Sequence, residues 1–162
     1  GGNGYIEDWI NPRLVRDAHL GSIWEGASNV IALDVLRCMR HQDAHRVLAD
    51  TYLSRLAPAP LTARLAEHWQ TLRGRGDTLL THDRDRQEFA VGDYTDALAR
   101  AVMATLLVEQ AAWEAKAGHG DRKTLVAEAY LQRLFTPDET PTTALDALAT
   151  IVDGHAAVEG LQ

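Results

Sequence analysis

The chain has 162 residues, and 23 acidic side chains face 16 lysines and arginines, so its formal net charge is −7. This length fits one domain, and 46% hydrophobic with 24% charged residues excludes the apolar-poor composition of a disordered chain. The acidic balance argues against a nucleic-acid partner, because such proteins take most of their affinity from clusters of lysine and arginine.

The cysteine and histidine content limits which disulfides and metal sites the chain can form. A single cysteine, Cys38, excludes an internal disulfide and a zinc site built from several thiolates. His41 and His45 are four apart and fit one helix face, but no third ligand follows nearby, so no metal is expected. No stretch approaches the roughly 20 apolar residues that cross a bilayer. We expect a cytoplasmic protein with no membrane partner.

Apolar residues recur every three to four positions and strand patterns are nearly absent, which predicts an all-α fold. Residues 1–29 are expected to be a loop-like segment that carries the site, because glycines and Pro12 interrupt them closely. Residues 30–162 are expected to form the helical bundle of the same domain.

The first three helices are predicted from their apolar faces. One covers 30–40, capped by Ser28 or Asn29, and a second covers 43–56 and stops at Pro58 and Pro60. A third runs from Leu61 to a point before Gly74 or Gly76. The side chains expected inward are Ile31, Val35, Cys38 and Met39 in the first, Val47, Leu48, Tyr52 and Leu56 in the second, and Leu61, Leu65, Trp69 and Leu72 in the third.

Three more helices complete the predicted antiparallel bundle. The fourth starts between 77 and 86 and ends at Gly118, and Gly92 allows a kink or a start at Asp93. The fifth covers 121–135 with Asp121 as its cap, and the sixth opens at Thr142 or Thr143. The fourth is expected to bury Tyr94, Leu98, Val102, Leu106 and Ala112; the sixth carries Leu145, Leu148 and Val152.

The stretch from Ser22 to Asn29 is the most informative, because it sets Glu25 between an indole and a glycine just before a helix. Ser22 and Glu25 fit the spacing of a capping box. Alternatively, Glu25 lies on a constrained turn beside an apolar wall, where desolvation raises a carboxylate pKa and makes it a useful base. Spacing alone leaves both interpretations open.

Three elements together decide between them. GGNGY at residues 1–5, RLVRDA at 13–18 and IWEGASNV at 23–30 resemble the signature region of the acyl-CoA dehydrogenase family, in the same order and at the same spacing. Trp24, in place of the commoner tyrosine, looks most like the AidB-like branch of that family. The remaining residues match the family's helical C-terminal domain in character more than in motif.

The resemblance implies an FAD-dependent enzyme that oxidises an acyl-CoA thioester to the 2,3-enoyl-CoA. Glu25 matches the base that removes the α proton while the β hydrogen leaves as hydride to the flavin. Trp24 matches part of the acyl pocket wall, and Gly26 lets the substrate approach the backbone closely. The backbone N–H of Glu25 matches a donor to the thioester oxygen.

Cofactor positions follow from the same resemblance. Ala27 and Asn29 match flavin contacts, and Gly1 and Gly2 match glycines that approach the FAD of a neighbouring subunit. Ala27 departs from the family, since many members have a threonine whose hydroxyl bonds the cofactor. Arg16 and Asp17 are expected to pair and hold the loop.

The family pattern also sets expectations for partners. It implies acyl-CoA as substrate, a homotetramer, and electron-transfer flavoprotein or a similar acceptor. Two domains that complete the site in the family are not found in these residues, so we expect the chain to be a C-terminal piece that does not turn over substrate alone and that self-associates. Alternatives are an AidB-like flavoprotein of the alkylation response that binds DNA, and a helical interaction module with a vestigial site.

Overall fold

The described residues of the computed structural model are 1–24, 26–57, 59–136 and 150–151. Within them the chain is helical and has no strand, which confirms the predicted all-α class. The elements are a short 3-10 turn η1 (Gly2–Gly4) and the helices α1 (Asn11–Leu20), α2 (Ser28–Gln42), α3 (Ala44–Arg55), α4 (Pro60–Thr81), α5 (Arg84–Ala117) and α6 (Arg122–Phe135). The sixth helix predicted from Thr142 or Thr143 lies outside the described residues.

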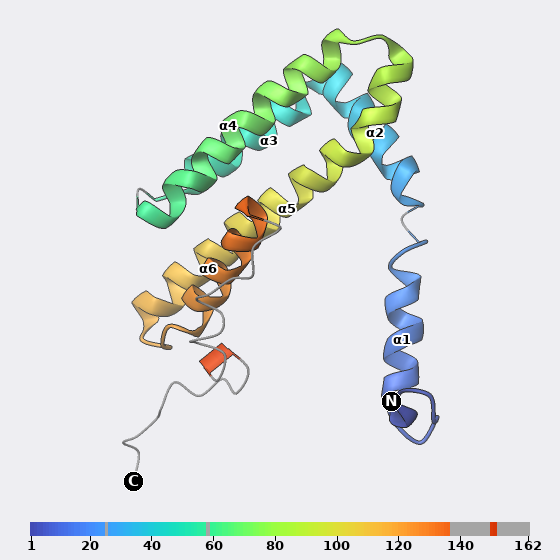
Figure 1. Ribbon diagram of the computed structural model, residues 1–162, viewed down its shortest axis with the longest axis vertical. Helices are drawn as coiled ribbons and strands as arrows, with labels where there is room; N and C mark the ends of the chain where they lie inside the picture. The colour runs from blue at the N-terminus through green and yellow to red at the C-terminus, as the bar shows by residue number, and fades with distance from the viewer. Residues whose placement is uncertain (25, 58, 137–149, 152–162) are drawn as a thin grey trace.

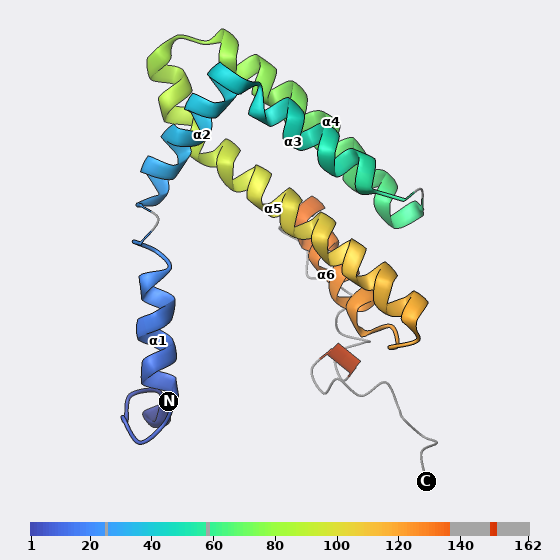
Figure 2. The same ribbon diagram turned by 180° about the vertical axis from the view of Figure 1, so that it is seen from behind.

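Two antiparallel helix pairs form the body of the molecule. α3 lies beside α4, and α5 lies beside α6 (Figures 1 and 2). The long α5 joins the pairs, because α2, α4 and α6 all pack against it. The predicted antiparallel helical bundle is therefore confirmed. α1 stands apart from this body in both views, and its main contacts among the described elements are with η1.

Local backbone geometry sets the helix ends. Asp43 takes a left-handed conformation at φ 50° and separates α2 from α3. The second predicted helix stops as expected, since Leu56 is already extended ahead of the proline-rich turn. Thr62 Oγ1 accepts a hydrogen bond from the Ala59 N–H at 3.0 Å and fixes the start of α4. Asp83 accepts from the Arg86 N–H at 3.0 Å and caps α5.

Trp69 is the centre of the core. Its side chain is fully buried on α4, and its ring stacks on Tyr52 of α3 with centroids 5.2 Å apart. Its indole N–H donates to Thr105 Oγ1 of α5 at 2.9 Å, and the Thr105 hydroxyl donates in turn to the Ala101 carbonyl. Every polar atom of this buried group is thus satisfied, as burial requires. The predicted stripe Leu65, Trp69 and Leu72 is confirmed as core.

Gly76 marks the closest approach of three helices. A Cβ at this position would lie 2.5 Å from His45 Cδ2 on α3 and 2.5 Å from Tyr94 Oη on α5. His45 Nε2 lies 2.9 Å from Asp77 Oδ1, and Tyr94 Oη donates to the Leu72 carbonyl at 3.0 Å. Only a residue without a side chain fits between the two rings.

Two predicted boundaries are wrong, both because of glycine or proline. α4 continues through Gly74 and Gly76 to Thr81, because packing at Gly76 outweighs the low helix propensity of glycine. Residues 11–20, expected to be loop-like, form α1. Pro12 occupies the first turn, where its missing N–H costs nothing, and Gly21 follows the last residue. Pro12 and Gly21 therefore lie at the two ends of one helix and do not interrupt it.

The predicted inward faces drift on the longer helices. Leu106 is 44% exposed and Ala112 is exposed, whereas Ala101, Thr105, Val108 and Ala111 are buried. The prediction advanced by four residues at each step, which rotates about 40° past the true period of 3.6. Val47 at 60% and Ile31 at 40% exposure are also wrong, and Cys38 is only half-buried. Met39 is buried as predicted, and the other buried residues of α2 and α3 are Ala32, Leu36, His45 and Ala49.

Substituting Gly76 by alanine should lower the free energy of unfolding by about 1–3 kcal/mol, because a methyl group there overlaps His45 and Tyr94. Gly74→Ala is the matched control on the same helix, since nothing lies within 4 Å of its added Cβ. That variant should gain up to about 1 kcal/mol from better helix propensity. Urea unfolding followed by circular dichroism measures both, and equal effects of the two variants would contradict the packing described.

Candidate functional site

Gly1 and Gly2 begin a tight turn with open surroundings. The Gly4 N–H donates to the Gly1 carbonyl at 2.9 Å, and the Tyr5 N–H donates to the Gly2 carbonyl at 3.0 Å. No atom lies within 4 Å of a Cβ built on either glycine. The backbone of this turn is therefore accessible to a ligand or to another chain.

An ion pair ties the turn region to α1. Arg16 Nη1 lies 2.8 Å from Glu7 Oε1, and its other amino group lies 3.4 Å from Oε2, so the contact is bidentate. The expected pairing of Arg16 with Asp17 is wrong, because adjacent helical residues point in different directions. Asp17 pairs instead with Arg13 one turn earlier, at 3.8 Å. Both pairs are exposed, so each adds little stability.

The turn between α1 and α2 holds Trp24 and Gly26. The Trp24 side chain is 69% exposed, and its backbone N–H donates to the Leu20 carbonyl at the end of α1. Gly26 has φ 105°, a conformation that side-chain-bearing residues rarely adopt. Glu25, the predicted catalytic residue, lies outside the described residues.

The capping-box interpretation of Ser22 fails. Its hydroxyl donates to the His19 carbonyl at 2.7 Å, so it finishes α1 and does not start α2. The N-cap of α2 is Ala27, which makes no side-chain capping bond. The expectation that Ser28 or Asn29 caps this helix is therefore wrong. Asn29 Oδ1 accepts from the adjacent Val30 N–H at 3.1 Å.

The predicted site residues fall into two groups. Gly26, Ala27 and Asn29 lie together at the start of α2, next to Trp24. Gly1 and Gly2 lie at the opposite end of α1, whose ten residues span about 15 Å (Figure 1). The structure does not bring the two groups together within one chain.

His41 and His45 do not share a helix face, because α2 ends at Gln42 and α3 begins at Ala44. His45 is buried and bonds Asp77, whose Oδ1 also accepts from Arg46 Nε at 2.7 Å. These two bonds hold the pKa of Asp77 below its ordinary value. In the described part of the chain, no group of three or more His, Cys, Asp or Glu side chains is arranged to hold a metal ion.

Sequence reasoning missed the apolar surface around α1. Large hydrophobic side chains are exposed along it, among them Trp9 at 55%, Ile10 at 64% and Ile23 at 68%. Patches of this kind mark interaction surfaces in folded proteins. The helical spacing of Ile10, Leu14 and neighbouring residues was the available signal, but the glycines and proline concealed it.

The structure is therefore an all-helical bundle, and a turn that contains Gly26 precedes its first helix, α2. Two curated proteins match short stretches of the chain. Acyl-CoA dehydrogenase family member 11 of Caenorhabditis elegans is 60% identical over 37 residues, 23% of this chain and 6% of that protein. Putative acyl-CoA dehydrogenase AidB of Escherichia coli K12 is 50% identical over 42 residues, 26% of this chain and 8% of that protein.

These matches relate the chain to the acyl-CoA dehydrogenase family over a short stretch. The aligned stretch spans less than a tenth of the length of each of these relatives. No family model and no solved structure matches the chain. Among the described helices, none combines the length and the apolar character that a membrane span needs.

Replacing Gly26 by alanine should disturb the turn and leave the bundle intact. The positive φ costs a residue with a side chain about 1–3 kcal/mol locally, but the segment does not contribute to the core. Amide NMR shifts of residues 23–30 should change while the Trp69 indole signal and the urea midpoint stay in place. Gly2→Ala is the control, and a large loss of global stability in Gly26→Ala would show that the turn supports the core.

Proposed function

We propose that the chain is the C-terminal part of an FAD-dependent acyl-CoA dehydrogenase, in which Glu25 is the base that removes the substrate α proton. The order and spacing of the three sequence elements carry this proposal. Both matched proteins are named as acyl-CoA dehydrogenases, one of them as putative.

Local geometry supports a reactive role for the Glu25 turn. The Ser22 hydroxyl donates to α1 and the N-cap of α2 is Ala27, so Ser22 is not the N-cap that its sequence suggested. Gly26 at φ 105° permits a backbone path that brings a ligand close to the chain. Trp24, which precedes Glu25 in the sequence, is exposed and provides an apolar surface on which an acyl chain can lie.

The residues at the start of α2 fit a flavin. Ala27 and Asn29 lie in the first turn, where backbone N–H groups favour electronegative ligand atoms, and no acidic residue occupies that turn. Ala27 lacks a hydroxyl, so its contact is through the backbone. When bound, FAD supplies the acceptor for the β hydrogen, which leaves as hydride. The α proton goes to the Glu25 carboxylate, and the product is the 2,3-enoyl-CoA.

The separation of Gly1 and Gly2 from Gly26 supports two different cofactor contacts. The turn with Gly1 and Gly2 lies at the far end of α1, about 15 Å away along the helix, so the flavin ring held at Ala27 does not itself reach it. Gly1 and Gly2, with open backbone, are suited to the FAD of a second subunit. This assignment favours a homotetramer, with acyl-CoA as the substrate and electron-transfer flavoprotein or a similar acceptor as the partner that removes electrons.

In the longer polypeptide, Glu25→Gln should retain FAD and fail to bleach when acyl-CoA is added. Loss of a positioned base slows proton removal by about 10²–10⁴-fold. Stopped-flow absorbance with butyryl-, octanoyl- and palmitoyl-CoA measures the rate, and Glu67→Gln on the exposed face of α4 is the control.

Unchanged bleaching in Glu25→Gln would reject Glu25 as the base. A longer polypeptide that carries no flavin would instead favour an interaction module with a vestigial site.

The isolated 162-residue chain should self-associate through the apolar surface around α1, since several large hydrophobic side chains there are exposed to water. Sedimentation velocity over a range of concentrations should show species larger than the monomer. Leu14→Lys should shift the distribution toward the monomer, whereas Phe89→Lys should not, because Phe89 is 91% exposed on α5 and isolated from this surface. A monomer at all concentrations would contradict the proposal.

A further inference from the structure

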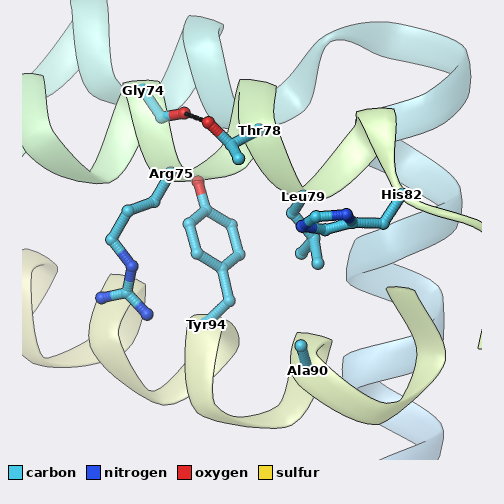
Figure 3. Close-up of a pocket in the computed structure, with 7 residues that line it drawn as sticks. All are labelled: Gly74, Arg75, Thr78, Leu79, His82, Ala90 and Tyr94. Carbon is cyan, nitrogen blue, oxygen red and sulfur yellow. Dashed lines mark hydrogen bonds between the residues drawn. The ribbon is translucent and has the colours of Figure 1, made fainter. Parts of the chain in front are cut away.

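A cavity of about 530 Å³ lies between the second half of α4 and the first part of α5, away from the segment that resembles the acyl-CoA dehydrogenases. Figure 3 shows the side chains that line it. Leu79, Ala90 and Tyr94 form an apolar base, of which Leu79 and Tyr94 are almost completely buried. The remaining lining residues are Gly74, Arg75, Thr78 and His82. The volume is in the range of small-molecule sites.

The lining can carry positive charge and contains no carboxylate. Arg75, His82 and Tyr94 are its ionisable residues. Burial raises the pKa of Tyr94 to about 12, so its phenol stays neutral, and its hydroxyl already donates to the Leu72 carbonyl. With an arginine and no carboxylate in its lining, the cavity is better suited to an anion than to a cation.

Arg75 is the available cation. Within the described residues it makes no ion pair, although its neighbour Arg73 lies 3.1 Å from Asp50. Asp77, two residues away, is turned to His45 and Arg46. The Arg75 guanidinium lies 5.9 Å from the centre of the Tyr94 ring, along the wall of the cavity. Figure 3 shows Arg75 on one side of Tyr94 and His82 on the other.

We propose that this cavity binds a small organic anion, namely a carboxylate or a phosphate ester attached to a compact apolar body. The planar guanidinium of Arg75 donates two parallel N–H bonds to two oxygens of such a head group. The apolar body lies on Leu79, Ala90 and the edge of Tyr94, and the exposed His82 ring borders the other side. A bare anion uses only half of the site.

Titrations of the 162-residue chain with benzoate, phenyl phosphate, benzamide and inorganic phosphate, followed by amide NMR, test this proposal. Benzoate or phenyl phosphate should shift the Gly74 and Thr78 amides saturably, and the tighter of the two identifies the head group. Neutral benzamide and inorganic phosphate should each bind at least about tenfold more weakly, since each lacks one part of the ligand.

The variant Arg75→Gln should weaken binding of the tighter aromatic anion by about tenfold or more, and Arg73→Gln is the matched control that should bind as the parent does. Both side chains are exposed, so both variants should keep the parent circular dichroism spectrum. The proposal is overturned if neither aromatic anion binds saturably, if benzamide or inorganic phosphate binds equally well, or if the two variants weaken binding to the same extent.

Discussion

The close approach of α3, α4 and α5 at Gly76 is the constraint on which the bundle depends. His45 and Tyr94 occupy the space that a side chain at position 76 would fill, and both are anchored, one to Asp77 and the other to the Leu72 carbonyl. Because these contacts join three helices at one point, they set how closely α4 approaches α3 and α5 there. Trp69 then packs between Tyr52 and Thr105 two turns away.

The position of α2 follows from the same arrangement. α2 packs on α5, and Gln87 on α5 connects it to the α4–α5 turn. Arg40 Nε donates to Gln87 Oε1 at 2.9 Å, while the Gln87 amide donates to the Leu80 and His82 carbonyls. The start of α2 is therefore presented from a rigid body, although the segment before it makes few contacts with that body. At this position, α2 is held by the bundle, whereas the segment that precedes it is open to solvent.

How far the sequence predicted the fold depended on which residue type dominated each stretch. Leu65, Trp69 and Leu72 predicted the inner face of α4 correctly, because the whole stripe is apolar and regularly spaced. The end of the same helix was missed, because nothing in the sequence reports that Gly76 faces two rings. α1 was missed because Pro12 and Gly21 resemble breaks when they are only its ends. Local propensity cannot register contacts between distant residues.

The sequence predicted the candidate site only in part, for the same reason. Motif order was enough to predict the family relationship and to select Glu25, Trp24 and Gly26 as site residues. The positive φ of Gly26 and the engagement of Ser22 with α1 depend on backbone geometry that spacing alone left open. Arg75 carried no sequence signal, because what distinguishes it is that it forms no ion pair within the described residues, and pairing is visible only in three dimensions.

The separation between core and site residues explains how both can coexist in one chain. The buried core consists of residues from α2 to α6, whereas the residues that resemble the dehydrogenase signature lie before or at the first turn of α2. Substitutions in the signature segment thus change the surface that a ligand or partner meets without opening the core. Conversely, Trp24 and the apolar side chains of α1 stay largely exposed among the described residues, so a ligand or another chain that covered them would gain free energy from burying that surface.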